Sequence, residues 1–112
     1  MKQDLLQEAL VWPAAKFQSY TKRLAEPYWV AEPEDVLESN ARQIDAAGSS
    51  DLSISATVYP SRGVTLVTVY AADHPGLFYR IAGGIHLAGG SIIDARIHTT
   101  RDGMALDNFL VQ

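Results

Sequence analysis

The residues best placed to do chemistry lie in one short stretch, Asp73 to Phe78, between an apolar run and a helical pattern. Asp73 supplies a carboxylate, and as a helix N-cap it could accept hydrogen bonds from the first free amides of the helix. Pro75 suits a first helical turn, and Gly76 leaves room beside the backbone. Free amides and the positive end of a helix dipole attract a carboxylate, so the stretch predicts a seat for a small charged ligand. The same residues are also typical of a plain turn with a helix cap.

Other residues that could support catalysis lack the spacing that catalysis needs. Metal-assisted nucleotidyl transfer needs paired carboxylates near a Gly-Ser turn, but the turn at 48–51 has no second carboxylate at Asp-x-Asp spacing after Asp51. That turn is typical of a helix end. Asp94 and Asp107 could pair only if the strand register allows it, and we interpret Asp94 as an exposed strand charge. The remaining candidates are three histidines, which we interpret as ordinary surface residues: His74, His86 and His98.

Length and composition narrow the class of protein. A chain of 112 residues, 47% of them hydrophobic, can form one domain with a core. The formal charge of −4 and the scattered basic residues argue against nucleic acid as a partner. The absence of cysteine excludes disulfides and thiolate metal sites. Because no long apolar run or signal peptide is present, we expect a soluble cytoplasmic protein with no membrane partner, and the ends of the sequence suggest an excised fragment.

The first part of the chain is predicted to be a helical arm over residues 1–31, followed by a domain over 32–112. Two apolar stripes at helical spacing cover residues 2 to about 26 and are interrupted at Pro13. The segment Glu26-Pro27-Tyr28-Trp29 is predicted to break the helix and to bring two aromatic rings together. These rings could anchor the arm to this domain, to a partner copy or to another domain.

Hydrophobic periods and turn residues predict the remaining elements. In chain order they are helix 33–47, strand 52–59, strand 63–72, helix 75–88, strand 91–100 and strand 104–111. Gly83 and Gly84 fall inside a predicted helix, where each costs about 1 kcal/mol relative to alanine. They indicate either the close approach of another helix or a lack of room against the sheet. Asp94, Arg96 and His98 are expected on the polar, solvent-facing side of their strand.

The order of these elements is a cyclic permutation of the β-α-β-β-α-β ferredoxin-like arrangement. The predicted fold class is therefore α+β, with a four-stranded antiparallel sheet and two helices on one face, in the permuted order α-β-β-α-β-β after the arm. The predicted order of strands across the sheet is 52–59, 63–72, 104–111 and 91–100. Helix 33–47 and strand 52–59 could pack within one chain or swap between two copies.

Three motifs carry a resemblance to a known family. They are Asp-x-Pro-Gly-Leu-Phe at 73–78, Ile-Asp-Ala-Arg-Ile at 93–97 and Asp-Gly-x-Ala-Leu-Asp at 102–107. Together they resemble an ACT domain over residues 64–112, and more narrowly the first of the two C-terminal ACT domains of bacterial PII uridylyltransferase/uridylyl-removing enzymes. The resemblance implies a regulatory module that senses glutamine for nitrogen metabolism. It also implies a parent nucleotidyltransferase that acts on the PII protein with Mg²⁺, whereas this chain alone is expected to be non-catalytic and to hold no cofactor or metal.

The resemblance also implies where a ligand would bind, because ACT domains often bind a small amino-acid effector between two copies. The residues that match the effector loop are Asp73, His74, Pro75, Gly76, Leu77 and Phe78. The residues that match the segment closing the site from a partner domain are Gly90, Ser91 and Ile92. Many ACT domains have Asn where this chain has Asp73, and a carboxylate there would attract a ligand ammonium but repel its carboxylate.

Two functions are therefore compatible with the sequence. The first is an amino-acid-sensing regulatory module. The second is a structural module that forms a homodimer or pairs with a second ACT domain and binds no ligand of its own.

Overall fold

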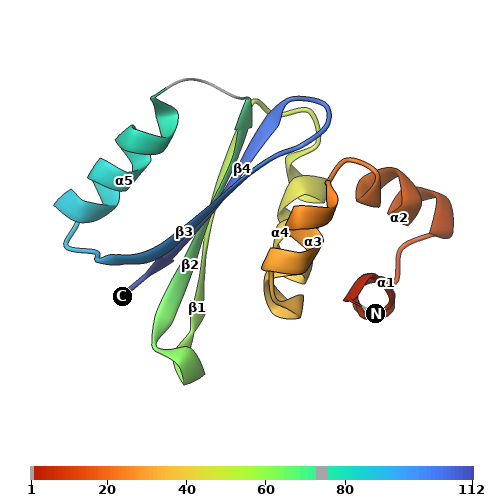
Figure 1. Cartoon of the computed structure of the whole chain (residues 1–112), viewed down its shortest axis with the longest axis horizontal. Coiled ribbons are helices and arrows are strands. Elements are labelled where there is room, and N and C mark those ends of the chain that lie inside the picture. Colours follow the sequence, from red (N-terminus) through yellow and green to blue (C-terminus); the bar gives the residue numbers. More distant parts are fainter. Residues whose placement is uncertain (1, 73–75) are drawn as a thin grey trace.

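A computed structural model describes residues 2–72 and 76–112 (Figure 1). The helices are α1 (Lys2–Leu10), α2 (Ala14–Thr21), α3 (Glu26–Ala31), α4 (Glu34–Ala47) and α5 (Leu77–Leu87), with a short 3₁₀ turn, η1 (Pro60–Arg62). The strands are β1 (Leu52–Tyr59), β2 (Val64–Ala72), β3 (Ile92–Thr99) and β4 (Met104–Val111). None of the helices in the described ranges is long and apolar enough to cross a membrane.

The four strands form one antiparallel sheet in the order β1-β2-β4-β3. Val64 pairs with Tyr59 at the β1–β2 turn, where Gly63 has the left-handed φ of 67° that a tight reversal requires. The α+β class, the antiparallel sheet and the predicted strand order are confirmed. Helix α4 and strand β1 pack against the rest of the same chain.

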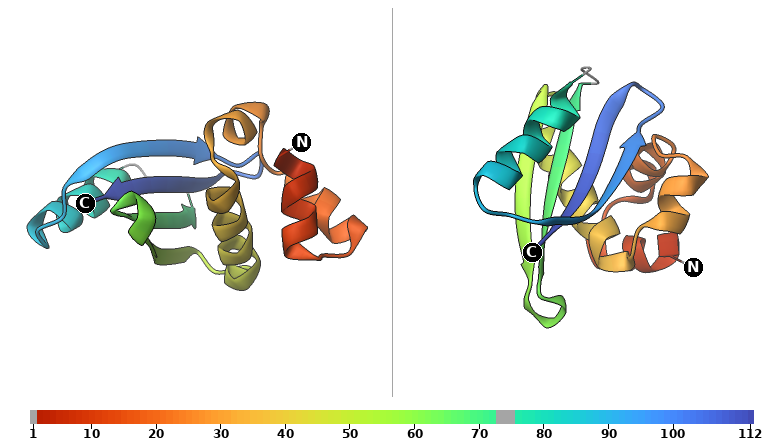
Figure 2. Two further views of the ribbon diagram at one scale, coloured as in Figure 1. Left: turned by 90° about the horizontal axis from the view of Figure 1, so that it is seen from below. Right: turned by 60° about the vertical axis from the view of Figure 1, so that its left-hand side comes forward.

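The sheet lies between two helical layers, which corrects the prediction that two helices share one face (Figure 2). Alternation along β2 explains the arrangement, because successive side chains point to opposite faces of a sheet. Val69 and Ala71 join the apolar cluster under α5, whereas Tyr70 joins the cluster with the arm helices. The ferredoxin-like strand order is thus present, but α5 covers one face and α4 the other.

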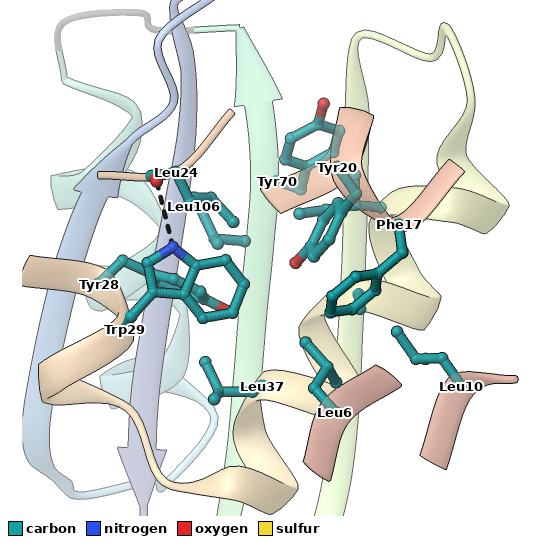
Figure 3. Close-up of a cluster of buried hydrophobic side chains, with 12 residues drawn as sticks. Leu6, Leu10, Phe17, Tyr20, Leu24, Tyr28, Trp29, Leu37, Tyr70 and Leu106 are labelled. Atoms are coloured by element: carbon teal, nitrogen blue, oxygen red, sulfur yellow. Dashed lines mark hydrogen bonds between the residues drawn. The ribbon is translucent and has the colours of Figure 1, made fainter. Parts of the chain in front are cut away.

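The arm has a hydrophobic cluster largely of its own (Figure 3). Its buried members from α1 to α4 and the linkers between them are Leu6, Leu10, Phe17, Tyr20, Leu24, Tyr28, Trp29, Leu37, Ala41 and Ile44. The sheet adds the buried Tyr70 and Leu106, and the partly buried Met104 packs against them. The predicted break in the helix is present, but it lies at 22–25, between the end of α2 and the start of α3. Residues 26–31 form α3, with a proline in its first turn where the missing N–H costs little, and the Tyr28 and Trp29 rings meet as predicted. The two aromatic rings of α3 therefore anchor the arm within this chain. The boundary at residue 31 stays a prediction, and the packing joins α4 to the same cluster.

Candidate functional site

The N-terminus of α5 is the first place where the sequence predicts ligand binding. The helix begins at Leu77, and its N-cap is Gly76, whose φ of 89° favours glycine. No side chain of a described residue caps this end, and the predicted N-cap Asp73 lies outside the described residues. Gly76 is exposed, and a Cβ added to it would meet nothing within 4 Å. The predicted site residues Asp73, His74 and Pro75 lie outside the described residues.

The next two predicted ligand residues, Leu77 and Phe78, belong to the core. Both pack against the apolar cluster of β2 and β4, and the Phe78 ring stacks on Phe109 at a centroid distance of 5.3 Å. Each is only partly exposed. Their first role is therefore to fix α5 on the sheet, which sets the position of the backbone at Gly76.

The last three predicted ligand residues lie together at the other end of α5. Gly90, Ser91 and Ile92 line an open depression of about 480 Å³ with His86 and Gly89. Gly90 has a structural reason for being glycine, because a Cβ there would lie 2.8 Å from the Ile85 side chain and 2.9 Å from that of Val111. A polar ligand could reach this depression without displacing the core.

The two predicted halves of the site do not meet within one chain. They flank an α5 of 11 residues, which spans roughly 16 Å at 1.5 Å per residue. A ligand the size of an amino acid cannot touch both ends at once. A site built from both halves therefore needs a second copy or a second domain.

A buried polar cluster lies on the face of the sheet opposite α5, and the sequence did not predict it. At its centre the Glu32 side chain is fully buried, and Arg96 Nε donates a hydrogen bond to its Oε1 at 2.8 Å. His98 Nε2 lies 2.7 Å from Glu32 Oε2, and Asn108 Nδ2 donates to the same oxygen at 3.1 Å. Burial alone would raise the pKa of Glu32, but the bonds from His98 and Asn108 and the charge of Arg96 together hold the pKa below its usual value.

This cluster overturns two interpretations of β3. Arg96 and His98 are not free surface residues, because their side chains are only 20% and 13% exposed and both reach Glu32. The sequence contains one signal for this cluster, which is the polar residue Asn40 on the inner face of α4. Its amide contacts Asn108 and Thr68, so it marks a polar layer between α4 and the sheet.

The described residues show no arrangement suited to metal-assisted catalysis. No group of three or more histidine, aspartate or glutamate side chains within 2–72 and 76–112 could hold a metal ion. Asp94 lies beside Arg96 on the arm side, whereas Asp107 pairs in register with Val69 of the α5 side, so the two carboxylates point to opposite faces. The turn at 48–51 ends α4, with Gly48 at φ 56°, as predicted.

Comparison with known proteins gives one consistent set of relatives. A bifunctional uridylyltransferase/uridylyl-removing enzyme of Novosphingobium aromaticivorans is 67% identical over 91 residues, which cover 81% of this chain and 10% of the enzyme. The enzymes of the same name from Erythrobacter litoralis and Zymomonas mobilis are 59% and 48% identical, and each match covers 99% of this chain and 12% of the enzyme. No protein-family profile matches the chain. The chain thus spans about a tenth of the length of the curated relatives that it matches.

Proposed function

Because this chain is homologous to one domain-sized segment of bifunctional uridylyltransferase/uridylyl-removing enzymes, we propose that it is a regulatory ACT-type module of such an enzyme. In this proposal the module binds an amino acid, L-glutamine, and reports its level to the rest of the enzyme. The parent would transfer uridylyl groups to and from the PII protein with Mg²⁺, while this module carries no catalytic residue. The observation that carries the proposal is the homology to an enzyme with two opposed activities.

Opposed activities in one protein require control. An enzyme that adds and removes the same group consumes its donor without net change unless a signal favours one direction. A ligand supplies such a signal only if it binds one conformational state better than the other. A small domain in series with the catalytic part is a suitable place for that ligand.

The geometry supports a ligand at the ends of α5. The N-terminal amides of α5 begin beside an exposed Gly76, and the open depression at Gly90, Ser91 and Ile92 lies at the other end of the same helix. The proposed site joins the first end in one copy to the second end in a partner copy. The α-carboxylate of the ligand is placed at the helix N-terminus, where the dipole favours an anion.

Isothermal titration calorimetry with L-glutamine, and with L-serine as the control ligand, tests this proposal. The variant Gly76→Ala forces a side chain into a left-handed conformation at the proposed site. Gly63→Ala is the matched control, because Gly63 also has a positive φ, of 67°, with open space around its Cβ, but lies at the far β1–β2 turn. We expect glutamine binding in the wild type and in Gly63→Ala, and weaker binding in Gly76→Ala. Absence of heat at millimolar glutamine, at protein concentrations where the chain is dimeric, would contradict the proposal.

A specific observation favours the second candidate function, a pairing module without a ligand. Gly83 and Gly84 lie on the exposed side of α5, and a Cβ on either would meet nothing within 4 Å. A lack of room against the sheet therefore does not explain them. Sedimentation velocity across a dilution series separates the functions, since a pairing module associates equally with and without glutamine.

A further inference from the structure

The arm, taken from here on as α1 to α4 with the linkers between them, is joined to the sheet by a polar layer in addition to its apolar contacts. Between α4 and the sheet lie polar side chains, several of them fully buried: Asn40 and Gln43 from the helix, and Ser53, Thr68 and Asn108 from the strands. At the β3 side of this layer, next to Asn108, lies the buried carboxylate of Glu32. A charge removed from water is costly unless its partners compensate it, so those partners decide whether the arm can dock.

Among the described residues, the side chains within hydrogen-bonding distance of the Glu32 carboxylate come from the sheet, whereas Tyr28 of α3 also faces it. Arg96 and His98 extend from β3, and Asn108 extends from β4. Together they contact both carboxylate oxygens at 2.7 to 3.1 Å. All three contact the carboxylate through nitrogen atoms, which are the groups that proteins use to bind carboxylates, and the guanidinium is always charged.

The sheet itself orients Arg96 and Asn108, although Asn40 of α4 also exchanges hydrogen bonds with the Asn108 amide and Tyr28 of α3 packs against the His98 ring. Asp94, two residues before Arg96 on the same strand, hydrogen-bonds Arg96 Nη1. Thr68 Oγ1 of β2 donates to Asn108 Oδ1 at 2.7 Å, which turns the Asn108 amide nitrogen toward the carboxylate. Preorganised donors lose less conformational entropy on binding than free ones.

The arm, for its part, can persist as a unit. Most of its buried cluster comes from α1 to α4, and the sheet adds Tyr70 and Leu106, with Met104 packed against them. Lys2 Nζ of α1 donates hydrogen bonds to the carbonyl oxygens of Trp29, Val30 and Glu32 at 3.0 to 3.1 Å, so α1 fixes the segment that presents the carboxylate.

From these contacts we propose that Arg96, His98 and Asn108 form a carboxylate receptor on the sheet, which Glu32 fills as an internal ligand and thereby holds the arm as a releasable module. The receptor is independent of the proposed glutamine site, which lies at α5 on the other face. When the arm lifts, the receptor remains formed and accepts a free carboxylate.

Chemical rescue with acetate tests the receptor in the 112-residue chain. Glu32→Ala empties the receptor, and Glu38→Ala is the matched control, since it removes the same type of side chain from an exposed pair with Arg42. We expect amide hydrogen exchange in α1 to α4 to be on the order of 100-fold faster in Glu32→Ala, because an unpaired buried charge weakens docking strongly. Exchange in β2 and β4 should stay slow. Sodium acetate should restore arm protection and raise Tm in this variant more than sodium chloride at equal ionic strength, and should change neither in the wild type or Glu38→Ala.

Two further variants test the charge of the receptor and cover the case in which Glu32→Ala does not fold. Adding Arg96→Met to Glu32→Ala should abolish the acetate effect, because the receptor loses its fixed charge. If Glu32→Ala is unfolded in chloride, refolding in acetate is the expected result, and Glu32→Gln, which keeps the side-chain shape, should still show faster exchange in the arm. An acetate effect no larger than that of chloride, or wild-type arm protection in Glu32→Gln, would overturn the proposal.

Discussion

The two faces of the sheet are held by different kinds of interaction. On the α5 side the contacts are apolar: Val69, Ala71 and Phe109 pack beneath α5. On the arm side, Tyr70 and Leu106 join an apolar cluster, but the strands are also connected to α4 by hydrogen bonds and to Glu32 by a buried ion cluster. Apolar packing is non-directional and scales with buried area, whereas the polar layer requires each donor to meet its acceptor. Helix α5 therefore belongs to the core of the sheet, whereas the arm packs on the sheet as a second unit.

The α5 face is also incompletely covered, unlike the arm face. Leu52, Ile54 and Val58 of β1 project on the α5 side and are 52%, 56% and 65% exposed. On the arm side of the same strand, Ser53 and Ser55 are bonded to Gln43. The apolar side of β1 therefore faces solvent in a single copy, and the polar side faces the protein.

The largest expected effect tests the apolar face. Phe109 is fully buried and stacked on Phe78, so Phe109→Ala should lower the free energy of unfolding by about 3–5 kcal/mol through lost burial and a cavity. Leu87→Ala is the control, because Leu87 is 88% exposed, and it should change stability by less than about 0.5 kcal/mol. Urea unfolding measures both. Equal effects of the two substitutions would mean that α5 is not packed on the sheet as described.

A smaller effect is expected in the polar layer. Asn40→Ala leaves the hydroxyl of Tyr28 and the amide of Asn108 without their partner at 2.9 Å, which should cost about 1–3 kcal/mol. Thermal unfolding of Asn40→Ala, Asn108→Ala and the double variant gives the coupling energy. A coupling near zero would show that the two amides do not interact across the interface.

Replacing exposed glycines of α5 should stabilise the protein, in contrast to the two destabilising substitutions above. Gly83→Ala and Gly84→Ala place a methyl group in open space on α5, so each should raise the free energy of unfolding of the monomer by about 1 kcal/mol. The gain is measured by urea unfolding at low protein concentration. A loss of stability in the monomer would show that these glycines are needed by the fold itself, and would remove the reason to assign them to pairing.

The smallest expected effect is a pH dependence of stability that arises from Glu32 on the arm face. The pKa of Glu32 is lowered in the folded state, so its contribution to stability is present above its unfolded pKa and is lost as the pH falls through the folded pKa. The groups that face it are Arg96 and His98 of β3, Asn108 of β4 and Tyr28 of α3, with Asp94 paired to Arg96. Acid unfolding of the wild type should therefore be steeper below the usual glutamate range than that of Glu32→Gln. Superimposable acid transitions would contradict the charge assignment.

The sequence predicts the sheet well because strand signals are local. Alternation in β1 and turn residues around Gly63 give both strands of the first hairpin, and Met104–Val111 matches the predicted range 104–111. The faces were harder to predict, since two helices were expected on one face of the sheet and instead cover opposite faces. Glu32, Arg96 and His98 were missed as a cluster because each looks like a surface charge, and only the tertiary fold brings residues this distant in sequence together. The candidate ligand residues at both ends of α5 remain predictions.

The most direct test of the proposed function is an NMR titration of the ¹⁵N-labelled chain with L-glutamine. The account predicts saturable shifts of the amides of Gly76 and of Gly90, Ser91 and Ile92, with L-serine producing none. Absence of shifts at both ends of α5, or shifts confined to the arm, would contradict it.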